Sequence, residues 1–184
     1  MTVEDKYTRP AIVLHWLIAL AIAINSGMML LYDDEQRTRP LMDLHKSIGI
    51  TVLGLVILRI LWRIGHQPPA LPSLYKPWER ALAHGVHGAL YLIILAVPLT
   101  GWLHDSAWKG APTHPLSLFG TIPWFRIPQV MAMQPIEKEH FHKILGEWHT
   151  QSAYLLYALF FAHLFGALKH QFLDRKKELQ RMWF

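Results

Sequence analysis

Hydrophobic residues in this chain gather into four long blocks, which polar or proline-containing segments separate. The blocks lie at about residues 11–31, 44–62, 81–103 and 145–168. A helix of about 20 residues is about 30 Å long, which matches the hydrocarbon thickness of a bilayer. Four buried helices of a soluble protein are the alternative, but the rest of the chain is too short for the polar shell that they need. The pattern predicts an all-α membrane protein, in which residues 1–184 form a single four-transmembrane-helix bundle with a long outer connection at 104–143.

The composition narrows the kinds of site that such a bundle can hold. Hydrophobic residues make up 52% of the chain and charged residues 17%, which excludes an intrinsically disordered protein. The absence of cysteine excludes disulfides, thiolate metal sites, iron–sulfur clusters and covalent c-type haem attachment. The chain has 12 histidines, so histidine is the main candidate for binding a metal or a cofactor.

Positive charge is distributed unevenly between the two sides of the predicted bundle. Eleven Lys and Arg residues fall on the side that holds the N-terminus, the second connection and the tail, against seven on the other side, among them Arg37. Cytoplasmic segments of membrane proteins carry the excess of Lys and Arg. We therefore expect a membrane protein with both termini in the cytoplasm. The pI of about 9.6 then reflects topology, since no basic stripe with interleaved aromatic residues indicates nucleic-acid binding.

Five histidines fall at two depths within the blocks, and ionisable residues inside a membrane usually mark function. His15, His87 and His163 lie near the cytoplasmic ends of their blocks, whereas His45 and His149 lie near the outer ends. Haem iron takes two axial ligands on opposite faces of the macrocycle, and histidines from two helices supply them. The depths predict two haems, one near each surface. Spacing alone does not select two ligands among the three inner histidines.

The blocks hold no carboxylate well inside them, because Asp43 and Glu147 fall at the outer margin. Zinc sites usually add Cys, Asp or Glu to histidine, and proton-driven or cation-driven carriers usually depend on a buried acid. The sequence therefore favours an electron-transfer protein. A histidine-using metal transporter is a remote alternative, and a purely structural membrane protein is another.

The inner level has more imidazoles than one haem can use, which indicates a second ligand there. His84 and His87 share a face of the third block, and His170 follows the fourth. These donors suit a quinone headgroup, whose carbonyls accept hydrogen bonds and whose reduction takes up protons. Arg59 at the inner level and Lys46 at the outer level are candidates for pairing with haem propionates. No role is assigned to the loop histidines His66, His104, His114 and His140.

Several short motifs together resemble a known family, although each motif alone is weak. They are RPAIVLHWL (His15), RPLMDLHKSIGI (Arg39, Pro40, His45, Gly49), ILRILWR (Arg59), LAHGVHGALY (His84, His87, Tyr91), AVPLTGW (Pro98, Gly101), LFGTIP and EWHTQSAYLLYALFFAHLFGALKH (His149, His163, His170). In this order and spacing they are specific, and they cover essentially the whole chain. The chain resembles the bacterial cytochrome b561 family, which is related to the cytochrome b subunits of nickel–iron hydrogenases and formate dehydrogenases.

The resemblance implies a protein of the bacterial inner (cytoplasmic) membrane with two non-covalent b haems, and it selects the ligands at the inner level. The axial ligands would be His15 and His163 for the inner haem iron, and His45 and His149 for the outer haem iron. With His84, the quinone candidates are then His87, His170 and Arg9.

For function, the resemblance implies a superoxide:ubiquinone oxidoreductase (a superoxide oxidase), which takes electrons from superoxide outside and reduces ubiquinone in the membrane. The alternative is a cytochrome b subunit that anchors a dehydrogenase or carries electrons for a periplasmic redox partner. The outer side carries eight acids against seven bases, whereas a surface that collects superoxide is expected to be positive. The electron donor therefore stays open.

Overall fold

The computed structural model describes residues 6–31, 39–70 and 75–183. Four long α-helices dominate this part of the chain: α1 (Arg9–Leu30), α2 (Arg39–Gly65), α3 (Pro77–Ala107) and α5 (Pro135–Leu168). The shorter elements are β1 (Ser117–Leu118), β2 (Ile122–Pro123), α4 (Pro128–Met131), the π-helical turn η2 (Lys169–Leu173) and α6 (Glu178–Arg181). The two strands pair antiparallel, with Leu118 opposite Ile122.

Proline marks where the long helices begin. Pro77 and Pro135 open α3 and α5, and Pro10 is the second residue of α1. Proline fits the first turn, because the amide hydrogen that it lacks has no acceptor inside the helix there. At the start of α3, the backbone amide of Lys76 also donates a hydrogen bond of 3.0 Å to the Glu79 carboxylate. Because these signals lie outside the apolar blocks, α3 and α5 both extend beyond the ranges predicted from hydropathy.

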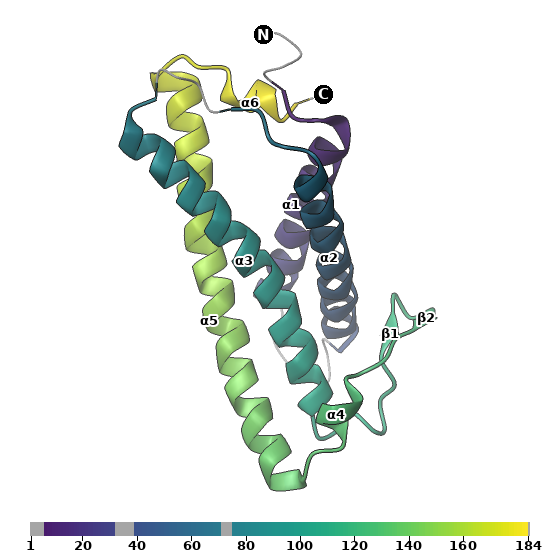
Figure 1. Cartoon of the computed structure of the whole chain (residues 1–184). Helices are drawn as coiled ribbons and strands as arrows, with labels where there is room; N and C mark the ends of the chain where they lie inside the picture. Colours follow the sequence, from purple (N-terminus) through teal and green to yellow (C-terminus); the bar gives the residue numbers. More distant parts are fainter. Residues whose placement is uncertain (1–5, 32–38, 71–74, 184) are drawn as a thin grey trace.

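The helices pack as two antiparallel pairs placed against each other, α1 with α2 and α3 with α5 (Figure 1). Ile18, Val52 and Val56 form a small buried cluster between α1 and α2. Both ends of the described chain lie at one end of the bundle, beside α6, whereas β1, β2 and α4 lie at the other end. An even number of spans places the two termini on the same side of a membrane.

Few side chains of the long helices are buried, and many large apolar ones are exposed. Leu20, Leu92 and Phe165, for example, are 60%, 73% and 63% exposed. A soluble monomer rarely exposes continuous apolar surface of this extent, and all four helices are long and apolar enough to span a bilayer. The bundle is therefore a multi-pass membrane protein whose apolar surface faces lipid.

Candidate haem-binding histidine pairs

Near the end of the bundle that carries β1 and β2, α2 and α5 bring two histidines together. The ring centres of His45 and His149 are 6.0 Å apart, and their planes are perpendicular, at 90°. Two imidazoles that bind one metal from opposite sides, through bonds of about 2.0–2.1 Å, have ring centres about 6.3 Å apart, since each ligating nitrogen lies about 1.1 Å from its ring centre. The outer pair therefore has the separation that a shared axial metal requires.

Two features of α3 hold the His149 ring in place. The Nδ1 atom of His149 lies 2.9 Å from the carbonyl oxygen of Val97. Because a carbonyl only accepts hydrogen bonds, Nδ1 carries the ring hydrogen and Nε2 keeps a lone pair, which is the form that binds a metal. A Cβ atom placed on Gly101 would lie 2.9 Å from Cε1 of His149. The His149 ring thus occupies the space that any side chain at position 101 would need.

His45 and His149 also line a cavity of about 860 Å³. This volume lies within the range of about 300–1,000 Å³ that is usual for cofactor pockets. One buried atom of a lining residue, Oδ1 of Asn25, has no hydrogen-bond partner among the described residues. Buried polar atoms are usually satisfied, so an unpaired one in a cavity of this size fits a site for a polar-edged group such as haem b.

Lys46, a propionate candidate, lines the same cavity but already has an anionic partner. Its ammonium lies 2.8 Å from Oδ1 of Asp105, and Nε of Arg126 lies 2.7 Å from Oδ2 of the same carboxylate. All three residues line the cavity, together with Arg39 and with Asp43, whose carboxylate lies 3.9 Å from the Lys46 ammonium. The lining thus has three cations and two carboxylates, which leaves one net positive charge beside the cavity. Asp105 was not singled out as a site residue from the sequence, because its pairing with Arg126 depends on how the 108–134 segment folds back.

The inner level brings three histidines together from α1, α3 and α5. The ring centres of His15 and His163 are 6.3 Å apart, with planes at 74°, whereas those of His87 and His163 are 5.1 Å apart. Only the first separation matches two imidazoles on opposite sides of one metal. Nδ1 of His87 lies 2.6 Å from the Ala83 carbonyl oxygen, so this ring too carries its hydrogen on Nδ1 and leaves Nε2 as an acceptor.

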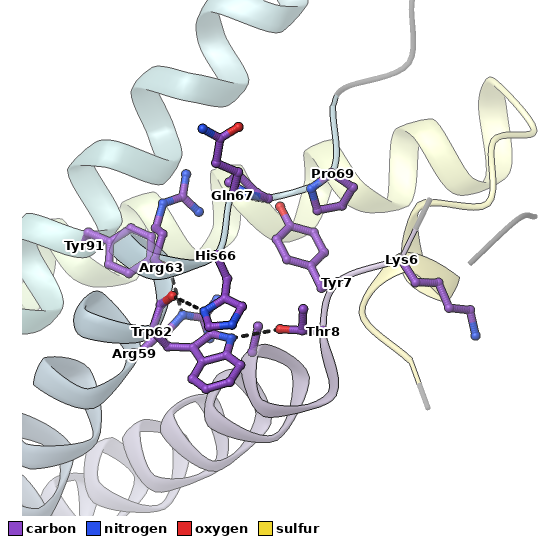
Figure 2. A pocket seen from close by; sticks show the side chains of 12 residues that line it. Lys6, Tyr7, Thr8, Arg59, Trp62, Arg63, His66, Gln67, Pro69 and Tyr91 are labelled. Atoms are coloured by element: carbon purple, nitrogen blue, oxygen red, sulfur yellow. Dashed lines mark hydrogen bonds between the residues drawn. The ribbon is translucent and has the colours of Figure 1, made fainter. Parts of the chain in front are cut away.

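Arg59 lies beside the inner histidines. Its Nε donates a hydrogen bond of 3.0 Å to the Tyr91 hydroxyl (Figure 2), and among the described residues it has no carboxylate within ion-pairing distance. A half-buried guanidinium without a counter-ion is suited to an anionic group such as a carboxylate.

The remaining quinone candidates do not form one cluster with His87. His84 and Arg9 are exposed. His170 stacks on Tyr75 with ring centres 4.3 Å apart, and its Nδ1 lies 2.6 Å from the Asp174 carboxylate. Within the described part of the chain, no hydrogen bond or ring contact joins His170 to His84 or His87.

His104 and His142, which the sequence left without a role, form a contact between α3 and α5. Their rings stack with centres 3.8 Å apart, and Nδ1 of each lies near the carbonyl oxygen of the other, at 3.2 and 3.0 Å. A Cβ atom on Gly146 would lie 2.8 Å from Cε1 of His104. The α3–α5 contact therefore repeats one arrangement twice, with a histidine of each helix seated against a glycine of the other.

A comparison with protein families matches residues 6–184 to the model described as prokaryotic cytochrome b561. The chain belongs to this family. Membership implies haem b, and it makes the protein a membrane electron carrier. The family's cofactor agrees with the donor set found here, namely imidazoles from separate helices facing each other at two levels.

Relatives span nearly the whole chain. The protein is 34% identical over 185 residues to "Cytochrome b561 homolog 2" of Escherichia coli, covering 97% of this chain and 91% of the relative. It is 28% identical over 187 residues to "Probable superoxide oxidase CybB" of Yersinia pestis, covering 97% and 96%. A third relative, "Cytochrome b562" of Cereibacter sphaeroides, is 35% identical over 123 residues, covering 61% and 76%.

Proposed function

We propose that the protein binds two b haems and carries electrons through them between the outer side of the membrane and the quinone pool. The inner haem would be held by His15 and His163, and the outer haem by His45 and His149. The observation that carries this proposal is the pair of ring separations, 6.3 Å and 6.0 Å, against about 6.3 Å for two imidazoles on one metal. Held by these histidines, haem would supply one-electron chemistry.

The protein's own groups set the form of these ligands. The Val97 carbonyl keeps the hydrogen of His149 on Nδ1 and so leaves Nε2 with the lone pair that would bind the haem iron. The Ala83 carbonyl does the same for His87, but His87 is the third imidazole at its level. Its free Nε2 is suited to exchange a hydrogen bond or a proton with a quinone oxygen. His170 and Arg9 stay secondary candidates, since no described contact joins them to His87. His84 lies one helical turn before His87 but is exposed, so it is secondary as well.

For the reaction, we favour superoxide:ubiquinone oxidoreduction. Two superoxide anions each give up one electron and leave as O₂, and one ubiquinone takes up two electrons and two protons to become ubiquinol. Support comes from the relative named probable superoxide oxidase. The net positive charge of the outer cavity's lining, three cations against two carboxylates, also attracts an anion. Both termini are placed in the cytoplasm, from the excess of Lys and Arg on their side.

The second candidate function is a cytochrome b subunit that serves another redox protein, either as a dehydrogenase anchor or as a carrier for a periplasmic donor. The names of two relatives describe a cytochrome without an enzymatic activity, which supports this second candidate. It requires a partner that co-purifies with the protein, whereas the first candidate requires rapid reduction by superoxide alone. Stopped-flow mixing of the purified holoprotein with superoxide distinguishes the two.

The ligand assignment is tested by haem content. His163→Ala is expected to remove the inner haem and keep the outer one, so the pyridine haemochrome assay falls from two haems per chain to one. His87→Ala, at the same depth, is the matched control and is expected to retain both haems. Loss of both haems or of neither from His163→Ala contradicts the assignment, and so does loss of a haem from His87→Ala.

A further inference from the structure

A second cavity, of about 130 Å³, lies between the start of α1, the end of α2 and Tyr91 of α3. It lies at the end of the bundle that carries both termini (Figures 1 and 2). Three basic residues, Lys6, Arg59 and Arg63, line the cavity, and no Asp or Glu is among its lining residues. Its chemistry is therefore that of an anion site.

The two guanidiniums are held in place without being neutralised. Both Arg59 and Arg63 lie over the ring of Tyr91, with Cζ atoms 5.6 and 5.1 Å from its centre. In the described part of the chain, neither has a carboxylate within ion-pairing distance. Two half-buried guanidiniums that share one aromatic ring repel each other, and an anion between or beside them relieves that repulsion.

The opposite wall of the cavity is aromatic and polar. His66 stacks on Trp62, with ring centres 3.8 Å apart and planes at 5°, and the Trp62 indole donates a hydrogen bond of 2.9 Å to the Thr8 hydroxyl. Figure 2 shows the Tyr7 ring beside this stack. Side chains that are apolar on one face and polar on the other are typical of the boundary between hydrocarbon and lipid headgroups.

The position of the cavity along the helices indicates what kind of anion it takes. Arg63 lies two residues before the end of α2, and Thr8 precedes the first residue of α1. The cavity is therefore at the depth where the hydrocarbon ends and lipid phosphates lie. The neighbouring α2 side chains Leu61 and Ile64 are 60% and 77% exposed, so apolar surface for an acyl chain adjoins the cavity.

We propose that this cavity binds the phosphate of an anionic phospholipid, with Arg63 as its main ligand and Lys6 as a second cation. The site is independent of the haem ligands and of the electron donor. Arg59 contributes positive charge as well, but it lies toward the inner histidines and is left for a haem propionate. Basic pockets between membrane helices commonly take acidic headgroups in this way.

The test uses the purified holoprotein in neutral detergent. Dioctanoyl-phosphatidylglycerol is titrated by calorimetry, with dioctanoyl-phosphatidylcholine as the zwitterionic lipid of equal chain length. We expect one saturable site for the anionic lipid. Arg63→Gln is expected to weaken binding about fivefold, since each Lys or Arg near a lipid surface contributes on this scale. Arg80→Gln, an exposed arginine at the start of α3 outside the cavity, is the matched control and is expected to bind like the wild type.

Several results would overturn the proposal. These are equal affinity for the two lipids, equal loss from Arg63→Gln and Arg80→Gln, or displacement of the lipid by equimolar inorganic phosphate, which would identify a free-anion site. Displacement by decylubiquinone would assign the cavity to a quinone headgroup instead. If Arg63→Gln does not fold, Lys6→Gln serves as the second variant, with a loss of similar direction expected. Haem per chain is measured in every variant, so failure of this site and failure of the haem assignment are read separately.

Discussion

Replacing Gly101 by alanine tests how closely α3 determines the geometry of the outer histidine pair. The added Cβ would lie 2.9 Å from Cε1 and 3.1 Å from Nδ1 of His149. Ordinary contacts at such atoms begin at about 3.4 Å, so the ring must move by about half an ångström or more, against tight surrounding packing. That movement disturbs the 2.9 Å hydrogen bond to the Val97 carbonyl and the separation from His45.

The cost of this overpacking is about 1–3 kcal/mol, which corresponds to a fall in outer-haem affinity of about 5-fold to 150-fold. Alanine is also the better helix former, by about 1 kcal/mol, and this gain acts in the opposite direction. Gly88→Ala controls for it, because Gly88 lies in the same helix and a Cβ there meets nothing within 4 Å.

The assay is haem per chain by pyridine haemochrome, together with a redox titration that resolves two components. Gly101→Ala is expected to lose the outer haem partly, or to shift the potential of one component only, whereas Gly88→Ala keeps both components unchanged. Two unchanged components in Gly101→Ala would refute the reasoning, and so would equal effects of the two substitutions.

Three further outcomes follow from the described contacts. Asp105→Asn leaves Lys46 and Arg126 without their shared carboxylate and should destabilise the protein by about 3–5 kcal/mol in thermal unfolding. Asp43→Asn, at an exposed carboxylate 3.9 Å from Lys46, is the control and should change the stability little. Equal effects of the two substitutions would contradict the role of Asp105. Arg181→Ala removes hydrogen bonds of 3.1 and 2.8 Å to the Pro69 and Ala70 carbonyls, each worth about 1.5–3 kcal/mol. Trypsin cleavage at Arg175–Lys177 should therefore accelerate at least tenfold. An unchanged rate would show that Arg181 does not hold the C-terminal segment against residues 69 and 70. Hydrogen bonds from Lys169 and, to a smaller extent, from His170 lower the pKa of the Asp174 carboxyl below 3.8, so its contact with η2 is lost only when pH falls below that lowered pKa. Lys169→Met should move the loss of this contact to higher pH, as measured by hydrogen exchange of residues 170–176. An unchanged pH profile would show that Lys169 does not hold the carboxylate.

The sequence predicted the four long apolar helices because the apolar blocks are long and the segments between them are polar. The helix ends were harder to place: α5 begins at Pro135, well before its apolar block, because proline and polar residues there form helix outside the hydrocarbon. Depth along each block grouped the histidines by level. It did not separate His87 from His15, since the difference between 5.1 and 6.3 Å to His163 depends on how three helices cross.

Other parts of the site depended on contacts between distant segments. The Asp105 network requires the outer connection to fold back onto α2, and no spacing in the sequence encodes that. The glycine–histidine contacts had a readable signal, because Gly101 and His104 share a three-residue spacing with Gly146 and His149. Where two packed helices each carry a glycine one turn before a histidine, each imidazole can occupy the space left by the missing side chain of the other helix's glycine.

One helix, α5, supplies a histidine to both levels, and this explains why the partners come from different helices. Fourteen residues separate His149 from His163, which is about 21 Å along the axis and about 40° short of four full turns. A straight helix therefore does not aim the two rings at the same neighbour. His149 faces α2 and His163 faces α1, and these two helices lie side by side (Figure 1). The angular offset of a regular α-helix thus lets α5 place one histidine against α2 and the other against α1. A one-residue insertion between the two histidines would turn one ring by about 100° relative to the other, which would separate one histidine pair and leave the other intact.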